Sequence, residues 1–357
     1  MLDKQGKTRS SLWRYWLALC FLCSLPVQAQ LAGKNVILVH GLQPGQLMQA
    51  SIDDRQVEQD GANYWSAFWA QHADDRLDWS SKQRLQQGIA EAAYDKVIGW
   101  SRSGFCNQGC VIVTHSTGDL VTRMLLDQQE IWTEAAGLQP LNVLAVLDFA
   151  GAGGGSELAQ LAIDVAGSNS WLTAPIRAAV NAFLGFTVTP EKLGVLEDLR
   201  PTVARQTAIG ASDVPRLRFV GGGNEYLGVT GPFLPGTDDG VVSLHSACGG
   251  NRIEGIDSCV NYRALDGKKT SVSAPKGLYV NHYPVLMGSN THHGGTIGDQ
   301  RGVELSYAAN NLQQGVNFSV ATKSRSSGWW LWKSTYHTVK NSENSSMSEQ
   351  VFNAVSL

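Results

Sequence analysis

The sequence has almost no charge imbalance. Its 28 Lys and Arg residues face 31 Asp and Glu residues over 357 positions, a formal net charge of −3. A protein that binds nucleic acid through the phosphate backbone usually carries a clear basic excess, so this balance argues against such a partner. No internal repeat is visible, and 43% of the residues are hydrophobic. This content excludes a disordered chain and suffices for one large domain.

Long apolar stretches are scarce, and the clearest one lies near the N-terminus. Basic residues between Lys4 and Arg14 precede an apolar stretch from Tyr15 to Leu25, and Val27-Gln28-Ala29 follows. This is the pattern of a secretory signal peptide cleaved after Ala29, and the apolar part is too short to span a bilayer. We therefore expect residues 1–29 to be removed. The mature protein would be secreted or periplasmic, without a transmembrane segment.

Cysteine is also rare, with six in the chain, of which Cys20 and Cys23 fall within the expected signal peptide. The remaining four are an even number in an oxidising compartment and predict two disulfides. They are Cys106, Cys110, Cys248 and Cys259. Three connectivities are possible, and the local pairing is favoured because each such pair brackets a short, turn-rich loop. Cys-x3-Cys without a nearby histidine is poor zinc spacing, so no metal is expected.

One strand-like run ends in a serine between small residues. Val111 to Thr114 is apolar and β-branched, His115-Ser116-Thr117-Gly118 follows, and Asp119 to Gln129 is compatible with a helix. A sharp strand-to-helix turn exposes a serine hydroxyl and aims the helix N-terminus at an oxyanion. The usual motif is G-x-S-x-G, in which Thr114 replaces the first glycine. Ser116 is therefore the predicted nucleophile.

A second strand-then-turn unit lies upstream. Asn35 to Val39 reads as a short buried strand, and His40-Gly41-Leu42 follows it. Such a turn can simply end a strand. It can also supply one backbone N–H to an oxyanion hole, while the residue after the nucleophile supplies the other. The two units together favour the second interpretation, with Leu42 and Thr117 as the donors.

With these motifs, the sequence resembles the α/β-hydrolase superfamily and, within it, the secreted bacterial lipases and esterases. The resemblance runs from about Lys34 to about Asn311. It implies a mostly parallel central sheet flanked by helices, an ester substrate and no cofactor. In some secreted lipases an Asp just after the catalytic histidine binds calcium, but Pro284 and Gly295 occupy the two candidate positions here. The landmarks are Val39–Leu42, Thr114–Gly118, Leu147–Ala159 and Asp238–Val242.

The resemblance also points to an acid. Arg216 to Gly221 reads as a strand, and the glycine-rich loop after it contains Asp238 and Asp239. Asp239 immediately precedes Gly240-Val241-Val242, where the similar lipases have the carboxylate that orients the histidine. An ordinary Asp-Gly turn is the alternative. We favour Asp239.

The base should follow Asp239, because Ser, Asp, His is the chain order in this fold. Leu278 to Met287 is apolar and predicts the last strand, with Asn290 to Gly295 as the loop after it. His293 in this loop is favoured, and His292 is an alternative. His282 is another, because Asn281-His282 resembles the Asn-His pair of some secreted lipases and Pro284 could end the strand.

The segment from Leu158 to Val214 has apolar residues at helical spacing, such as Ile176, Val180 and Phe183. Lipases have a mobile cap here whose apolar underside covers the cleft, although plain core helices would give the same pattern. Aromatics from Asn63 to Trp69 predict one helix with a broad apolar face, packed in the core rather than on substrate.

The character of the chain changes beyond Leu312. We expect a hydrolase domain over residues 30–314 and an extension over residues 315–357. Ser319 to Lys340 predicts a hairpin whose Trp329-Trp330-Leu331-Trp332 run packs against the domain, and Asn341 to Ser348 predicts a loosely held end. Contact of this Trp run with lipid or polymer is the less favoured alternative.

The function predicted is therefore that of a secreted serine hydrolase acting on carboxylic esters. Triacylglycerol or a related lipid ester is the preferred substrate. Alternatives are a short-chain carboxylesterase, a phospholipase or a lipid acyltransferase, and, in another class, a non-catalytic binding protein with this fold. The oligomeric state is not predicted.

Overall fold

The computed structural model describes residues 31, 33–168, 174–208, 212–253, 259, 277–307, 310–311, 315–329 and 333–357. The predicted signal peptide, residues 1–29, lies outside them, as do residues 169–173 of the predicted cap and residues 330–332 of the Trp run. In the described residues no helix is long and apolar enough to cross a membrane.

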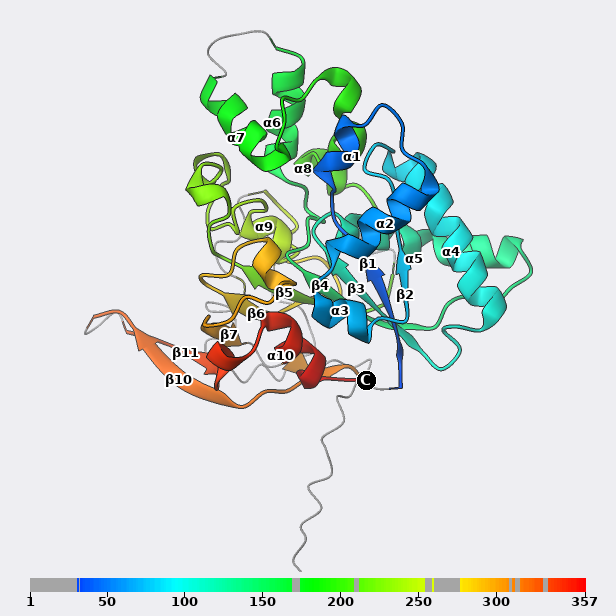
Figure 1. Ribbon diagram of the computed structural model, residues 1–357. Helices are drawn as coiled ribbons and strands as arrows, with labels where there is room; N and C mark the ends of the chain where they lie inside the picture. Colours follow the sequence, from blue (N-terminus) through cyan, green and yellow to red (C-terminus); the bar gives the residue numbers. More distant parts are fainter. Residues whose placement is uncertain are drawn as a thin grey trace, which may run out of the picture.

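Nine of the described strands form one sheet, in the order β10-β11-β7-β6-β5-β4-β3-β1-β2 (Figure 1). From β2 to β6 neighbouring strands are parallel, and β7, β11 and β10 continue the sheet antiparallel. The strands are β1 (Asn35–Val39), β2 (Asp75–Leu77), β3 (Cys110–His115), β4 (Val143–Phe149), β5 (Arg216–Gly221), β6 (His282–Gly288), β7 (Leu305–Tyr307), β10 (Thr322–Ser327) and β11 (Ser334–Val339). A small second sheet pairs β12 (Val355–Ser356), β9 (Asn317–Phe318) and β8 (Asn310–Asn311).

Helices cover both faces of the sheet. Successive side chains of a strand point to opposite faces, so Ile37 and Val39 of β1 join one core and Val36 and Leu38 join the other. Helices α4 and α5 pack on the first core, and α3 and α10 on the second. The helices are α1 (Pro44–Met48), α2 (Asp54–Tyr64), α3 (Ala67–His72), α4 (Ala90–Ser103), α5 (Gly118–Ala135), α6 (Glu157–Ala166), α7 (Ala174–Leu184), α8 (Pro201–Ala204), α9 (Leu244–Ala247) and α10 (Met347–Ala354).

The predicted strands are largely confirmed. Asn35–Val39 and Arg216–Gly221 form β1 and β5 with the expected bounds, and the run before Ser116 forms β3. The last predicted strand begins four residues later than expected, since β6 starts at His282. Pro284 lies inside β6 and does not end it.

The prediction of one helix over Asn63 to Trp69 is wrong. Helix α2 ends at Tyr64, the backbone is extended at Trp65 and Ser66 with ψ of 147° and 158°, and α3 begins at Ala67. The aromatic spacing fits a helical period on both sides of this break, so it conceals the turn. Core packing is confirmed for Trp65 and Trp69, which are 7% and 0% exposed.

The C-terminal part is tied into the main body. The predicted hairpin is confirmed, since β10 and β11 pair from Thr322 with Val339 to Ser327 with Ser334. The prediction of a loosely held end is wrong, because a capping box of Ser346 and Glu349 starts α10, which buries Met347 and Val351. The prediction that the Trp run packs against the domain is also wrong for Trp329, which is 90% exposed.

The segment from 158 to 214 forms α6, α7, two 3-10 turns (Pro190–Lys192 and Gly194–Glu197) and α8, with residues 169–173 and 209–211 outside the described part. Helices α6 and α7 pack on each other and rise above the upper end of the parallel strands (Figure 1). Phe183 and Val180 of α7 are buried. Both helices therefore bury an apolar face. This feature is common to a cap and to core helices, so it does not distinguish the two interpretations.

Both favoured disulfides are present. Cys106 joins Cys110, just before and at the start of β3, and Cys248 joins Cys259. Cys248 directly follows α9, in the loop region that leads away from Asp239. The first bridge therefore lies at the start of β3, whereas the second follows α9, the helix that comes after the Asp239 loop in the chain.

Replacing Cys248 and Cys259 by Ala should lower the free energy of unfolding by about 2 to 3 kcal/mol, because the bridge closes a loop with a sequence separation of 11. Urea unfolding measures the loss. The ester hydrolysis expected from the sequence should fall as well, since the support of the loop that contains Asp239 loosens. The Cys106→Ala and Cys110→Ala pair is the control, and it should lower stability while leaving activity unchanged. Equal activity in both double variants would contradict the link.

Candidate active site

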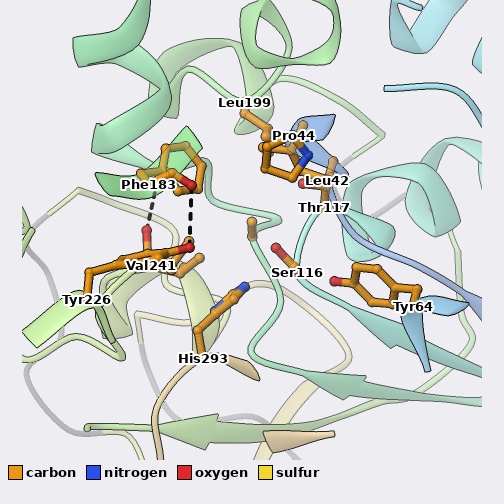
Figure 2. A pocket seen from close by; sticks show the side chains of 13 residues that line it. Leu42, Pro44, Tyr64, Ser116, Thr117, Phe183, Leu199, Tyr226, Val241 and His293 are labelled. Atoms are coloured by element: carbon orange, nitrogen blue, oxygen red, sulfur yellow. Dashed lines mark hydrogen bonds between the residues drawn. The ribbon is translucent and has the colours of Figure 1, made fainter. Parts of the chain in front are cut away.

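Three of the predicted site residues follow three parallel strands at the same edge of the sheet. Ser116 comes directly after β3, Asp239 lies in the loop after β5, and His293 lies in the loop after β6. Because parallel strands end at one edge, these loops converge there. Ser116 and His293 line the same pocket, and Figure 2 shows their side chains pointing toward each other.

Ser116 occupies a sharp turn between β3 and α5. Its φ of 57° is left-handed, a conformation that costs energy for a residue with a side chain. Its N–H donates to the Phe149 carbonyl at 3.1 Å, and its carbonyl accepts from the Ala152 N–H at 2.9 Å. A side chain on Gly118 would collide with the Val39 carbonyl, so glycine is required there. The turn has the geometry expected of a nucleophile elbow.

Thr114 stands where the motif usually has glycine, and the structure explains why it fits. Thr114 is fully buried on β3, and its hydroxyl donates a hydrogen bond to Asp148 Oδ1 at 3.0 Å. Asp148 belongs to the neighbouring strand β4. The larger residue is therefore accommodated by a polar partner within the sheet.

Asp239 and His293 are hydrogen-bonded. His293 Nδ1 donates to Asp239 Oδ2 at 2.8 Å, and the His293 N–H donates to the Asp239 carbonyl at 2.9 Å. Asp239 Oδ1 accepts from the N–H groups of Val241 and Val242 at 3.0 and 2.7 Å. These contacts fix the carboxylate and leave His293 Nε2 as the acceptor that faces Ser116.

Asp238, the other acid of this loop, has a different role. Its Oδ1 accepts from the Gly240 N–H at 2.8 Å. Burial, opposed by this hydrogen bond and reinforced by the charge of Asp239, raises the pKa of Asp238 to about 6. Asp238 therefore shapes the turn, whereas Asp239 contacts the histidine.

The two alternative bases are placed elsewhere. His292 Nδ1 contacts Glu225 Oε2 at 2.7 Å, and its side chain is 39% exposed. His282 lies at the beginning of β6, the opposite end of the strand from His293. There its Nδ1 donates to the Val280 carbonyl, and burial, with Arg218 and Arg216 adding to it, lowers the pKa of His282 well below 6.5.

The pocket in front of Ser116 is a cavity of about 90 Å³ with mainly apolar walls. Leu42 and Thr117 also line it, and within the described residues neither backbone N–H donates a hydrogen bond. Two such free donors beside a nucleophile are what an oxyanion hole requires. The apolar walls come from Pro44, Phe183, Leu199, Val241 and Val242.

His40 orders the turn that carries Leu42. Its Nδ1 donates to the Gly41 carbonyl at 2.8 Å, its Nε2 accepts from the Trp79 N–H at 3.1 Å, and its ring stacks on Trp79. Burial is the main cause that lowers the pKa of His40 to about 4. A neutral His40 therefore fixes the direction of the Gly41 peptide and, with it, of the Leu42 N–H.

Tyr64 and His115 are site residues that the sequence interpretation missed. The Tyr64 hydroxyl contacts His115 Nδ1 at 2.5 Å, and His115 Nε2 donates to the His293 carbonyl at 3.1 Å. Tyr64 lines the pocket, although the aromatic segment was interpreted as core. Only the position of His115 next to Ser116 is a signal in the sequence, because a sequence separation of 51 hides the pairing of Tyr64 with His115.

A buried charge cluster lies behind the elbow. Asp119, in the first turn of α5, pairs with Arg216 at 2.9 Å and Arg218 at 2.8 Å, and Arg218 also lies 2.9 Å from Asp148. Burial alone would raise the pKa of Asp119, but Arg218 and Arg216 hold it well below its usual value. The alternation Arg216-Leu217-Arg218 within an apolar strand is the sequence signal, since β5 is entirely buried.

Among the described residues, no group of three or more His, Cys, Asp or Glu side chains is arranged to hold a metal ion.

No protein-family model and no curated protein matches the sequence. Solved structures similar to this chain include the mature lipase BlEst2 of Bacillus licheniformis, at 18% identity over 60% of this chain and 78% of the lipase, with a TM-score of 0.37. Others are the metagenomic carboxyl esterase MGS0156, at 18% identity over 54% and 51% with a TM-score of 0.32, and phospholipase PlaB of Legionella pneumophila, at 17% over 60% and 46% with a TM-score of 0.37.

The topology of the sheet and the backbone geometry at Ser116 define the fold. The sheet is parallel from β2 to β6, helices cover both of its faces, and β3 leads through a left-handed serine into α5. The loops after β5 and β6 return to the same edge. The chain has the fold of the α/β-hydrolase superfamily.

Proposed function

We propose that the protein is a secreted serine hydrolase that cleaves carboxylic esters. The observation that carries the proposal is the set of three loops that brings Ser116 and His293 to one pocket, with His293 bound to Asp239 at 2.8 Å. The predicted signal peptide over residues 1–29 and the two disulfides support secretion.

The chemistry follows from the hydrogen bonds. Ser116 Oγ attacks the ester carbonyl while His293 Nε2 takes its proton, and the same nitrogen then returns the proton to the leaving alcohol. Asp239 stays ionised, holds the Nδ1–H tautomer of His293 and stabilises the imidazolium that forms. Water, activated by His293, then hydrolyses the acyl-enzyme.

The oxyanion of each tetrahedral intermediate would be held by the N–H groups of Leu42 and Thr117. Both residues line the pocket, and Thr117 stands at the N-terminus of α5, whose dipole favours negative charge. Fixed donors of this kind stabilise the transition state more than the substrate, because charge develops at the oxygen only as the bond forms.

A lipid ester is the preferred substrate class. The pocket walls are apolar, and Phe183 of α7 forms part of them, so the α6–α7 segment acts as a cap over the acyl-binding site. A short-chain carboxylesterase is the second candidate. It is favoured by the cavity volume of about 90 Å³, which fits a small acyl group while α7 is in this position.

Ser116→Ala should lower kcat by roughly 10⁴-fold or more while the protein stays folded, because only the nucleophile is lost. The measurement is hydrolysis of a soluble nitrophenyl ester, combined with labelling by a serine-directed phosphonate. Ser80→Ala is the control, since Ser80 does not line the pocket. An unlabelled, inactive parent would instead indicate a binding protein with this fold.

His293→Ala should inactivate the enzyme, whereas His292→Ala and His282→Ala should retain measurable turnover. Only His293 combines a contact to Asp239 with a place at the Ser116 pocket. The three variants are compared by kcat/KM on the same soluble ester, after circular dichroism has shown that each is folded. A dead His282→Ala variant beside an active His293→Ala variant would overturn the assignment.

A lipid esterase and a short-chain carboxylesterase should differ in how their activity responds to a lipid surface. If α7 covers the pocket, its opening in water exposes apolar surface at a cost of about 25 cal/mol per Å², and a lipid surface removes that cost. Activity on esters with long acyl chains should then rise sharply once the substrate aggregates. Phe183→Ser and Phe186→Ser should blunt this rise. Smooth saturation, with a preference for two- to four-carbon acyl groups in a series from two to sixteen carbons, would favour the short-chain carboxylesterase.

A further inference from the structure

We infer that Tyr64 and His115 form a hydrogen-bonded bridge that positions the oxyanion turn, the nucleophile and the base loop relative to one another. The inference rests on the proposed function, because it assigns a role to residues around the same pocket. Tyr64 comes from the end of α2, His115 from the end of β3, and His293 from the loop after β6. The bridge therefore joins three segments that are far apart in the sequence.

The chemistry of the groups fixes the direction of the two hydrogen bonds of His115. A carbonyl oxygen only accepts, so His115 Nε2 must carry the proton that it donates to the His293 carbonyl at 3.1 Å. Burial, reinforced by the neighbouring His293, lowers the pKa of His115 well below 6.5, so its ring is neutral. Its Nδ1 is then an acceptor, and the Tyr64 hydroxyl at 2.5 Å is the donor.

Tyr64 also contacts the oxyanion turn. Burial raises the pKa of the Tyr64 hydroxyl, which keeps its proton, and the nearby Gly41 backbone partly opposes that rise. Gly41 has no room for a side chain, because the Tyr64 hydroxyl and the Ser116 side chain fill the space. The phenol oxygen thus lies against Gly41, the residue before Leu42, and donates to His115, the residue before Ser116.

This geometry assigns Tyr64 a positioning role and not a direct one. Its single hydroxyl proton is committed to His115 Nδ1, so it is not free for an oxyanion. His115 in turn is committed to the main chain of His293, whose ring lies 4.6 Å from the His115 ring between centroids. What the bridge sets is the placement of the His293 imidazole and the Leu42 N–H around Ser116.

Loss of the bridge should therefore affect the transition state and not substrate binding. Tyr64→Phe keeps the aromatic wall of the pocket and removes the hydrogen bond to His115 together with the contact of the phenol oxygen with Gly41. A misplacement of reacting groups by a fraction of an ångström to one ångström lowers rates by up to about 100-fold. KM on a soluble short ester should stay near the parent value, because the wall is unchanged.

The experiment compares the full chain with Tyr64→Phe and with Tyr307→Phe. Tyr307 is a matched control, since its buried hydroxyl donates to the Phe318 carbonyl at 2.7 Å, away from the pocket. We expect kcat to fall between about 10- and 100-fold in Tyr64→Phe only.

A second pair of variants decides the matter if Tyr64→Phe does not fold. His115→Gln keeps a donor and an acceptor in the place of the ring, whereas His115→Leu keeps neither. The glutamine variant should retain much more kcat than the leucine variant at similar melting temperature. Parent kcat in Tyr64→Phe, or equal kcat in the two His115 variants, would overturn the inference. A parent that neither hydrolyses esters nor reacts with a phosphonate would instead overturn the proposed function.

Discussion

The rest of the site depends on the left-handed backbone of Ser116. A φ of 57° is unfavourable for serine, and it is maintained because hydrogen bonds to Phe149 and from Ala152 hold both sides of the turn. Gly118 leaves the space that the Val39 carbonyl fills, and Gly41 leaves the space for Tyr64 and Ser116. A side chain at either glycine would therefore move Ser116 and the neighbouring N–H groups of Leu42 and Thr117 at once.

The buried ion pairs behind the turn at Ser116 connect this turn to β5, the strand that precedes the loop with Asp239. Asp119 begins α5, and Arg216 and Arg218 belong to β5, the strand that leads to Asp239. Removing several charges from water is costly, so such a cluster is weak evidence for added stability. Removing one partner would leave an unpaired buried charge, which is strongly unfavourable. The cluster therefore restricts how α5 and β5 can shift past each other, and with them the serine and the acid.

The sequence predicted the features that depend on local patterns. The apolar runs identified β1, β3 and β5, and the spacing of small residues around Ser116 identified the turn. The break between α2 and α3 was missed because the aromatic spacing is helical on both sides. Ser66, at the N-cap position of α3, is the only residue in the segment that indicates a new helix start. Contacts across long separations, such as Tyr64 with His115 and Glu225 with His292, depend on how loops converge, which no local pattern records. Chain order limited the base to histidines after Asp239, and the choice of His293 followed from its place in the loop after the last predicted strand.

The contact between α3 and α10 has a consequence for the order of folding. Trp69 Nε1 donates to Ser348 Oγ at 2.9 Å across 279 residues, and Phe352 packs on Phe68 and Trp69. A chain that emerges N-terminus first holds this apolar face open until α10 follows, so this core closes only after Met347–Ala354 has emerged. Such long-range closure slows folding and prolongs the exposure of apolar surface. The packing of α10 on α3 thus determines how long this apolar surface stays exposed to aggregation or to chaperone binding.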